Sequence, residues 1–388
     1  MSSSAQVPVL VSLLEKDAVP FETLRERYGA LLELVHALLG VVPNCDPYLE
    51  IWPVAFRSYN VMVPNLLNLP LMLWGLGAPR STVGLAMYVA SRNAGCAYCS
   101  AHACTFALRR GATVDEVASA LESEALPKAD AAAVRVARAL ALVPTTIDDV
   151  TRGEMRQHFS AADEEWIVLS IAMMGWLNKT MDGLGVPLEE PTVAEVRALI
   201  APAGWSAGKH MPGALPSTKA PPPPDSLGKR LSVIRHAPKA VGFDKQWTRD
   251  VPDRWPAVGK FLREKTGHDF PVLGRLRHRA AVRAIATMIR DNFCETVVGR
   301  DQKLAAGLIY ADVVGDASLA AQLRAAGAAP VPESPVQLLA RAVAPSPAAV
   351  DEQVVAACRD LSPAAVVEVV TFVALLQLLH RLESYYAV

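Results

Sequence analysis

The sequence has few cysteines for its length and almost no excess charge of either sign. Its 388 residues include six cysteines, Cys45, Cys96, Cys99, Cys104, Cys294 and Cys358. They are too few and too scattered for a disulfide scaffold. The formal net charge of −1 gives no reason to expect nucleic acid or a membrane as a partner. At 52% hydrophobic residues, the chain is long and apolar enough for about two cores.

Long hydrophobic runs and long alternating stretches are also missing. The most apolar segment, Ala364 to Leu379, is interrupted by polar residues and is too short to span a bilayer comfortably, which predicts a buried core helix. Without long strictly alternating stretches, a sheet is not expected. Met1-Ser2-Ser3-Ser4 lacks the basic and apolar regions of a signal peptide, so the expected location is cytoplasmic.

Proline, glycine and serine are concentrated in one segment. From Ala201 to Asp225 their density, including four consecutive prolines at Pro221–Pro224, predicts an extended spacer. We therefore expect a first domain over residues 1–200, a Pro-rich linker over 201–228 and a second domain over 229–388.

Most of the remaining sequence favours helices. Thr113 with Glu116 forms a capping-box pattern, and Ser160 with Asp163 forms a weaker one. Ser362 offers a cap that is followed by proline at the first helical position. The predicted fold class is all-α.

The segment Cys96-Ala97-Tyr98-Cys99-Ser100-Ala101-His102 carries the strongest chemical signal. Two thiols one helical turn apart can close a disulfide with little backbone movement, and a helix N-terminus stabilises a thiolate. A histidine nearby can accept the thiol proton. Asn93-Ala94-Gly95 predicts a break before the thiols, and Gly111 predicts the end of the helix that follows.

This motif, read as Asn-x-Gly-Cys-x-Tyr-Cys-x-Ala-His, resembles the AhpD-like alkylhydroperoxidase branch of the carboxymuconolactone decarboxylase family. The segment Leu177–Val186 also resembles the end of that domain. The resemblance covers roughly residues 50 to 190 and implies an all-helical hydroperoxide reductase. It also implies that Cys99 meets the peroxide, that Cys96 resolves it as a disulfide, and that His102 assists.

Two positions depart from the family pattern. The family's relay glutamate lies twelve residues before the first cysteine, where this sequence has Gly84. No acidic residue occurs from Leu66 to Val114. The family's histidine follows the second cysteine by four residues, where this sequence has Ala103, and His102 comes one residue earlier. A shift of one residue turns a side chain by about 100° around the helix axis.

The two halves of the sequence resemble each other, which predicts an internal duplication of an AhpD-like helical domain. Placing Cys96 on Cys294 sets Val297 at the position of Cys99 and Arg300 at that of His102. The second copy is therefore expected to be degenerate and structural, with the active site in the first half.

The expected function is a thiol-dependent, antioxidant peroxidase with Cys99, Cys96 and His102 as catalytic residues and neither cofactor nor metal. Its expected partners are a hydroperoxide or disulfide substrate, an external dithiol reductant and further copies of the chain. A general thiol-disulfide oxidoreductase is a close variant. A ligand- or partner-binding helical scaffold with a vestigial motif is the non-enzymatic alternative. Lactone decarboxylation is disfavoured, because family members that perform it do not depend on this cysteine pair.

The cysteines and the large apolar side chains also have explanations that involve no catalysis. The two thiols could be buried apolar side chains or half of a metal site. Cys45, Cys104 and Cys358 are expected to be core residues. A last group of side chains fits either a substrate pocket or helical core packing: Trp166, Met173, Met174 and Trp176.

Overall fold

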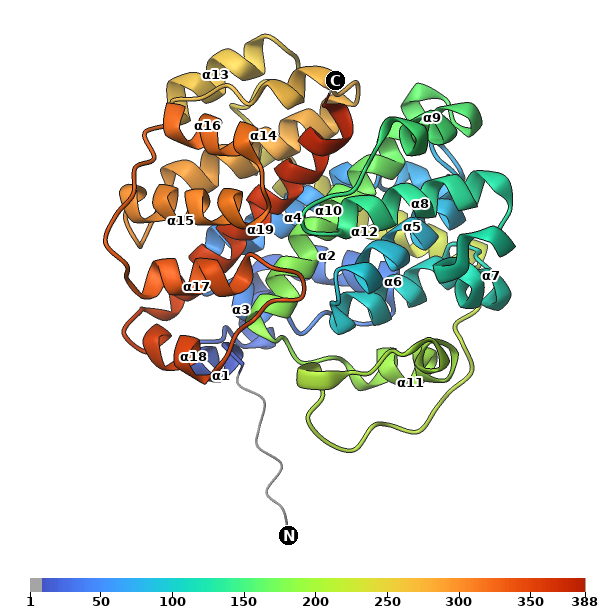
Figure 1. Ribbon diagram of the computed structural model, residues 1–388. Coiled ribbons are helices and arrows are strands. Elements are labelled where there is room, and N and C mark those ends of the chain that lie inside the picture. The colour runs from blue at the N-terminus through green and yellow to red at the C-terminus, as the bar shows by residue number, and fades with distance from the viewer. Residues whose placement is uncertain (1–8, 388) are drawn as a thin grey trace.

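The computed structural model describes residues 9–387, and every regular element in that range is a helix (Figure 1). The first eleven α-helices are α1 (Val11–Leu14), α2 (Phe21–Leu39), α3 (Asp46–Leu49), α4 (Pro53–Leu66), α5 (Arg80–Asn93), α6 (Ala97–Arg109), α7 (Val114–Ser119), α8 (Lys128–Ala141), α9 (Asp149–His158), α10 (Ala161–Leu184) and α11 (Glu190–Ile200). The others are α12 (Leu227–Trp247), α13 (Ala257–Thr266), α14 (Arg279–Cys294), α15 (Arg300–Val313), α16 (Ala317–Ala325), α17 (Pro335–Val343), α18 (Glu352–Cys358) and α19 (Pro363–Tyr386). The predicted all-α class is confirmed.

Side-chain caps fix the helix starts that the sequence predicts. Thr113 and Glu116 form a complete capping box at α7. Ser160 Oγ accepts the backbone N–H of Asp163 at the start of α10. Ser362 caps α19, with Pro363 at its first position. Each cap satisfies a backbone N–H that a helix start would otherwise leave unpaired.

The centre of the molecule is formed by α10 and α19, which pack along each other (Figure 1). Among the described helices, α19 is the one that is long and apolar enough to cross a membrane, and 89% of its most apolar window is buried inside the protein. A helix that is apolar on all sides is typical of a protein core. The prediction of a buried core helix is confirmed.

Polar side chains at this core reach from one half of the chain to the other. Arg381 donates to the carbonyl of Ile171 at 2.7 Å, and the Tyr385 hydroxyl donates to Glu164 at 2.7 Å. Lys179 donates to Ala344, Pro345 and Ser346 of the second half. These buried donors tie the halves together because leaving them unpaired would be costly.

The helix starts recur along the chain in the same order. The caps Cys96, Thr113 and Asp148 have counterparts at Gly299, Asp316 and Asp351, each 203 residues later (299 − 96, for example). This order supports the duplication, which stays a prediction.

The predicted pairing of Cys96 with Cys294 is wrong. Cys294 ends α14, whereas Cys96 caps the start of α6. At the offset of the helix starts, Gln302 and Ala305 of α15 occupy the positions of Cys99 and His102. The alignment through the cysteine uses an offset of 198 (294 − 96), whereas the helix starts recur at an offset of 203, so it slips by five residues.

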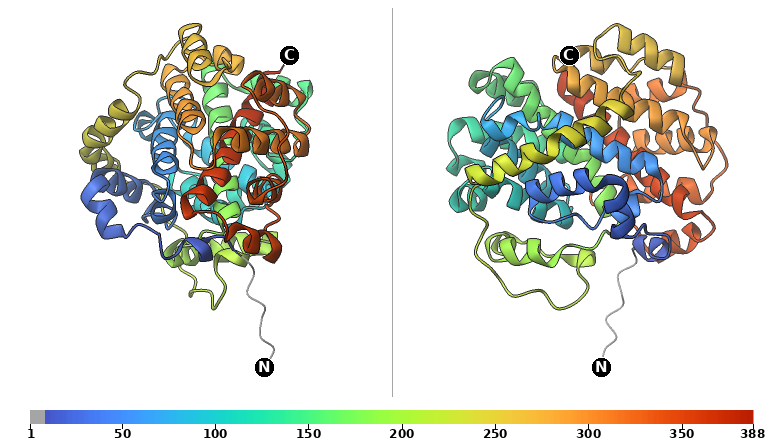
Figure 2. Two further views of the ribbon diagram at one scale, coloured as in Figure 1. Left: turned by 90° about the vertical axis from the view of Figure 1, so that its left-hand side faces the viewer. Right: turned by 180° about the vertical axis from the view of Figure 1, so that it is seen from behind.

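Residues 211–226 have no regular secondary structure and lie along the first half before α12 begins (Figure 2). Asp225 forms a buried ion pair with Arg110 and donates its backbone N–H to the carbonyl of Arg109. The prediction of a spacer without regular structure from Ala201 to Asp225 fits only its second part, because Ala201–Ala203 and Gly208–His210 form short 3-10 helices in which His210 is buried. The domain boundaries on either side of it stay a prediction.

Candidate active site

A sharp turn between α5 and α6 places the two thiols. Gly95 has a φ of +70°, which favours glycine, and a Cβ there would lie 2.9 Å from Cδ of Pro347. Cys96 then caps α6, with its sulfur accepting the backbone N–H of Cys99 at 3.3 Å. The predicted helix-to-helix corner is confirmed, and the second half of the chain packs on it through Pro347.

Both thiols are buried. Cys96 is 0% exposed and Cys99 is 3% exposed. Burial raises the pKa of Cys99 well above its usual value, and neighbouring Cys96 and Asp182 raise that pKa further. A thiol in such surroundings stays protonated at neutral pH, so its activation needs a base nearby.

His102 lies three residues after Cys99 on α6 and is paired with an acidic residue. Its Nε2 lies 2.6 Å from Oε2 of Glu189, the residue just before the first residue of α11. His102 Nδ1 is buried and has no hydrogen-bond partner. Because the carboxylate accepts the Nε2 proton, Nδ1 of the neutral ring keeps its lone pair and can accept another proton.

Glu189 is held by three donors, two of them on α6 and one in the loop before α3. Besides His102, it accepts the backbone N–H of Asn44 at 2.6 Å and the hydroxyl of Tyr98 at 2.8 Å. Burial raises the pKa of Glu189, but His102 and these hydrogen bonds outweigh burial and bring that pKa below its usual value. Glu189 is therefore ionised and fixes the orientation of His102.

A second carboxyl group next to Glu189 behaves in the opposite way. Burial raises the pKa of Asp46 from 3.8 to about 8, and the charge of Glu189 contributes to this rise. The Cys45 thiol lies 3.9 Å from Oδ1 of Asp46. At neutral pH Glu189 is therefore ionised and Asp46 is protonated, an arrangement found where acid and base roles are divided.

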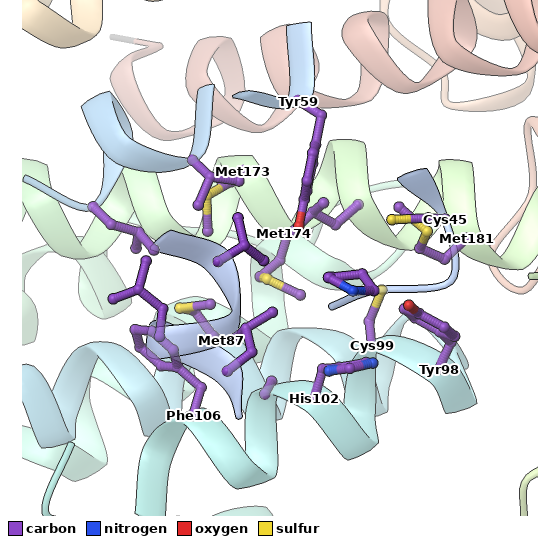
Figure 3. Close-up of a pocket in the computed structure, with 18 of the residues that line it drawn as sticks. Cys45, Tyr59, Met87, Tyr98, Cys99, His102, Phe106, Met173, Met174 and Met181 are labelled. Atoms are coloured by element: carbon purple, nitrogen blue, oxygen red, sulfur yellow. The ribbon is translucent and has the colours of Figure 1, made fainter. Parts of the chain in front are cut away.

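An apolar cavity of about 80 Å³ opens beside these groups. Figure 3 shows Cys99, His102, Tyr98 and Cys45 on its wall, opposite Met173 and Met174. The rest of the lining is almost entirely aliphatic or aromatic: Val35, Leu38, Leu39, Pro43, Tyr59, Val63, Leu67, Leu69, Met87, Ala103, Phe106, Leu177 and Met181. Such a site suits a small apolar molecule with one polar end toward the thiol.

The position of the family's relay glutamate is closed in this structure. A Cβ on Gly84 would lie 2.5 Å from Cα of Ala107, because α5 and α6 cross in close contact there. A longer side chain does not fit at this crossing, and the carboxylate that contacts His102 is that of Glu189. His102 faces Glu189 from a position one residue earlier than the family's histidine.

Comparison with known proteins places the thiol segment. Residues 71–142 match the family model "Carboxymuconolactone decarboxylase family". The match covers 72 of the 388 residues (142 − 71 + 1). Cys96, Cys99 and His102 lie inside the carboxymuconolactone decarboxylase segment, whereas Asn44, Asp46 and Glu189 lie outside it.

Two solved structures are similar to this chain. The apo debrominase Bmp8 has 19% identity and a TM-score of 0.42, and the match covers 47% of this chain and 95% of that one. A cysteine-to-alanine variant of Bmp8 with bound 2,3,4-tribromopyrrole has 18% identity and a TM-score of 0.41, with coverage of 52% and 98%. A search of curated proteins returns no match.

The structure brings together all three residues that the sequence singled out, at the start of α6. Four side chains were expected either to line a pocket or to pack in the core. Of these, Met173 and Met174 line the cavity, and Trp176 is fully buried. Trp166 instead stacks on His278, with ring centroids 3.7 Å apart.

Cys45, expected in the core, lies both in the core and on the cavity wall. Sequence reasoning missed Glu189, Tyr98, Asn44 and Asp46. Tyr98 lies within the motif itself. The only signal for Glu189 was its place just after the segment that resembles the family's domain end.

Proposed function

We propose that this protein reduces hydroperoxides, with Cys99 as the attacking thiol and Cys96 as the resolving thiol. The observation that carries the proposal is the hydrogen bond between His102 and Glu189 beside a buried thiol, with Nδ1 of His102 unpaired. A core cysteine needs no oriented base, whereas a nucleophilic thiol with a raised pKa does.

In the first step, His102 Nδ1 takes the proton from the Cys99 thiol. The thiolate attacks the terminal peroxide oxygen, the O–O bond breaks, and the leaving alkoxide takes a proton from the histidine to become an alcohol. Cys99 is oxidised to a sulfenic acid by two electrons, and the peroxide is reduced by two.

In the second step, the thiolate of Cys96 attacks the sulfur of Cys99. The S–S bond forms, the S–O bond breaks, and hydroxide leaves and is protonated to water. An external dithiol then reduces the disulfide by thiol exchange. Because Cys96 is completely buried, the small-molecule step comes before any contact with a larger reductant, and the turn at Gly95 must open for the last exchange.

The cavity favours one second candidate, the binding of an apolar ligand without turnover. A general thiol-disulfide exchange with protein substrates has less support, since both thiols are buried.

Turnover separates these possibilities. With dithiothreitol as reductant, the wild-type protein should consume cumene hydroperoxide, whereas Cys99→Ser should not. Cys96→Ser should retain one turnover and accumulate a sulfenic acid that dimedone labels. Cys104→Ala, on the same helix but away from the cavity, is the matched control and should keep the wild-type rate. Absence of turnover together with tight binding of cumyl alcohol would favour the ligand-binding candidate.

A further inference from the structure

The outer face of α12 carries an apolar stripe that no other described element covers. Leu227, Leu231, Ile234 and Val241 are between 41% and 62% exposed. At about 100° per residue, these four side chains fall within about 80° of each other around the helix. The opposite face is buried through Val233 and Ala240 and packs on α2 and α4. Figure 2, right, shows α12 lying across the surface of the molecule.

The charges along this helix are almost all positive. Arg230 and Arg235 flank the stripe on its two sides, and Lys239 and Lys245 add further positive charge toward the end of the helix. No acidic residue occurs from 226 to 243, and the one acid of the helix, Asp244, accepts a hydrogen bond from Asn65 at 2.7 Å. The net charge of −1 for the whole chain hides this local excess.

A second apolar group extends the face. In the short helix η1 (Leu71–Trp74) and the turn after it, Leu71, Trp74 and Leu76 are 39–55% exposed. The chain just before η1 and the middle of α12 line one groove. The segment that contains η1 has no acid from residue 66 to residue 114, and the one acid that lines the groove is Asp244.

We propose that the outer face of α12, together with η1, docks on an anionic lipid surface. An amphipathic helix with apolar side chains between flanking cations lies in the plane of a bilayer interface, where lysine and arginine reach the headgroups. Tryptophan is favoured at the same depth. A second copy of the chain is a poor occupant, because two such faces would place cations against cations.

The docking face lies next to the proposed active site. The groove under α12 shares Val35, Leu38, Tyr59, Val63 and Leu69 with the cavity that contains Cys99. If the proposed peroxidase activity holds, an apolar hydroperoxide could pass from lipid to thiol through these side chains. The docking itself does not depend on that activity.

Vesicle flotation of the full-length protein tests the docking without any enzymatic readout. The protein should float with vesicles of phosphatidylcholine and phosphatidylglycerol and stay behind with phosphatidylcholine alone. Binding should fall steeply in about 0.5 M NaCl, because salt screens the headgroup charge. An Arg235→Gln and Lys239→Gln variant should bind about 30-fold more weakly.

The apolar stripe has its own variant and control. Leu231→Ser with Ile234→Ser should reduce vesicle binding at least about 10-fold. Val150→Ser, at a 71% exposed valine on α9, should bind like the wild type. Circular dichroism should show unchanged folding, since all these side chains are on the surface. Absence of flotation, or equal flotation of the wild type and the Leu231/Ile234 variant, would overturn the proposal. So would a wild-type dimer that this variant converts to a monomer, because the face would then join two copies.

Discussion

At the scale of single residues, the proposed chemistry depends on the orientation of one imidazole. Glu189 accepts the Nε2 proton of His102, which leaves Nδ1 free to serve as a base. The same logic operates wherever a buried carboxylate fixes the tautomer of a catalytic histidine.

Glu189→Gln should slow the oxidation of Cys99 by a hydroperoxide by about 10²–10⁴-fold at neutral pH. A glutamine amide that donates to Nε2 forces the proton onto Nδ1, where it blocks the acceptor. Stopped-flow measurement of the single-turnover rate would show this change. Glu190→Gln, at the exposed neighbouring acid, is the control. An unchanged rate in Glu189→Gln would mean that His102 is not the base.

Asp46 should make folding depend on pH. Its folded pKa is about 8, against an ordinary value of 3.8. Between these values the unfolded chain releases a proton that the folded protein keeps, so the free energy of unfolding should fall as pH rises from about 4 to 8. The contribution is at most about 1.4 kcal/mol per pH unit.

Urea unfolding of Asp46→Asn should therefore show a flatter pH profile than the wild type over that range. Asp115→Asn, at an exposed acid, should leave the profile unchanged. A wild-type profile that is already flat would contradict the assignment.

At the scale of helices, the close crossing of α5 and α6 leaves no room for an acidic side chain at Gly84. The two helices meet so closely at Gly84 that a Cβ would strike the backbone of Ala107. The caps and the corner at Cys96 were predictable from sequence, because they are local signals of three or four residues. Glu189 was not, since it lies 87 residues from His102 and no local pattern links them.

Gly84→Ala should destabilise the protein by about 1–3 kcal/mol, because the added methyl group overpacks the crossing. Gly153→Ala is the matched control, since that helical glycine has open space around its Cβ position. The control should be neutral or stabilising by up to about 1 kcal/mol. Urea unfolding measures both, and equal effects would show that the crossing is looser than described.

At the scale of the whole molecule, the two halves form one core around α10 and α19. The all-α class was predictable from the lack of alternating stretches and from the helix caps. The register between the halves was not, because a gapless alignment through Cys294 differs by five residues from the offset of the helix starts. The net charge of the whole chain gave no reason to expect a membrane partner. A net charge does not show how charges are distributed, and the cations of α12 are concentrated on one helix.

The shared core predicts that both halves unfold together. Lys179, Arg381 and Tyr385 each bond across the halves from buried positions, so neither half keeps its polar groups paired alone. Differential scanning calorimetry should give one transition, with equal calorimetric and van't Hoff enthalpies. Two separate transitions would show that the halves are independent domains.

The central claim is that Cys96 and Cys99 form a redox pair, and intact mass tests it most directly. Reduced, metal-free protein is treated with one equivalent of an organic hydroperoxide, and free thiols are counted alongside the mass. The mass of the wild-type protein should rapidly fall by that of two hydrogen atoms, and its count of free thiols should fall by two. Cys99→Ser should form no such disulfide. An unchanged wild-type mass would contradict the peroxidase account and leave the cavity as a binding site.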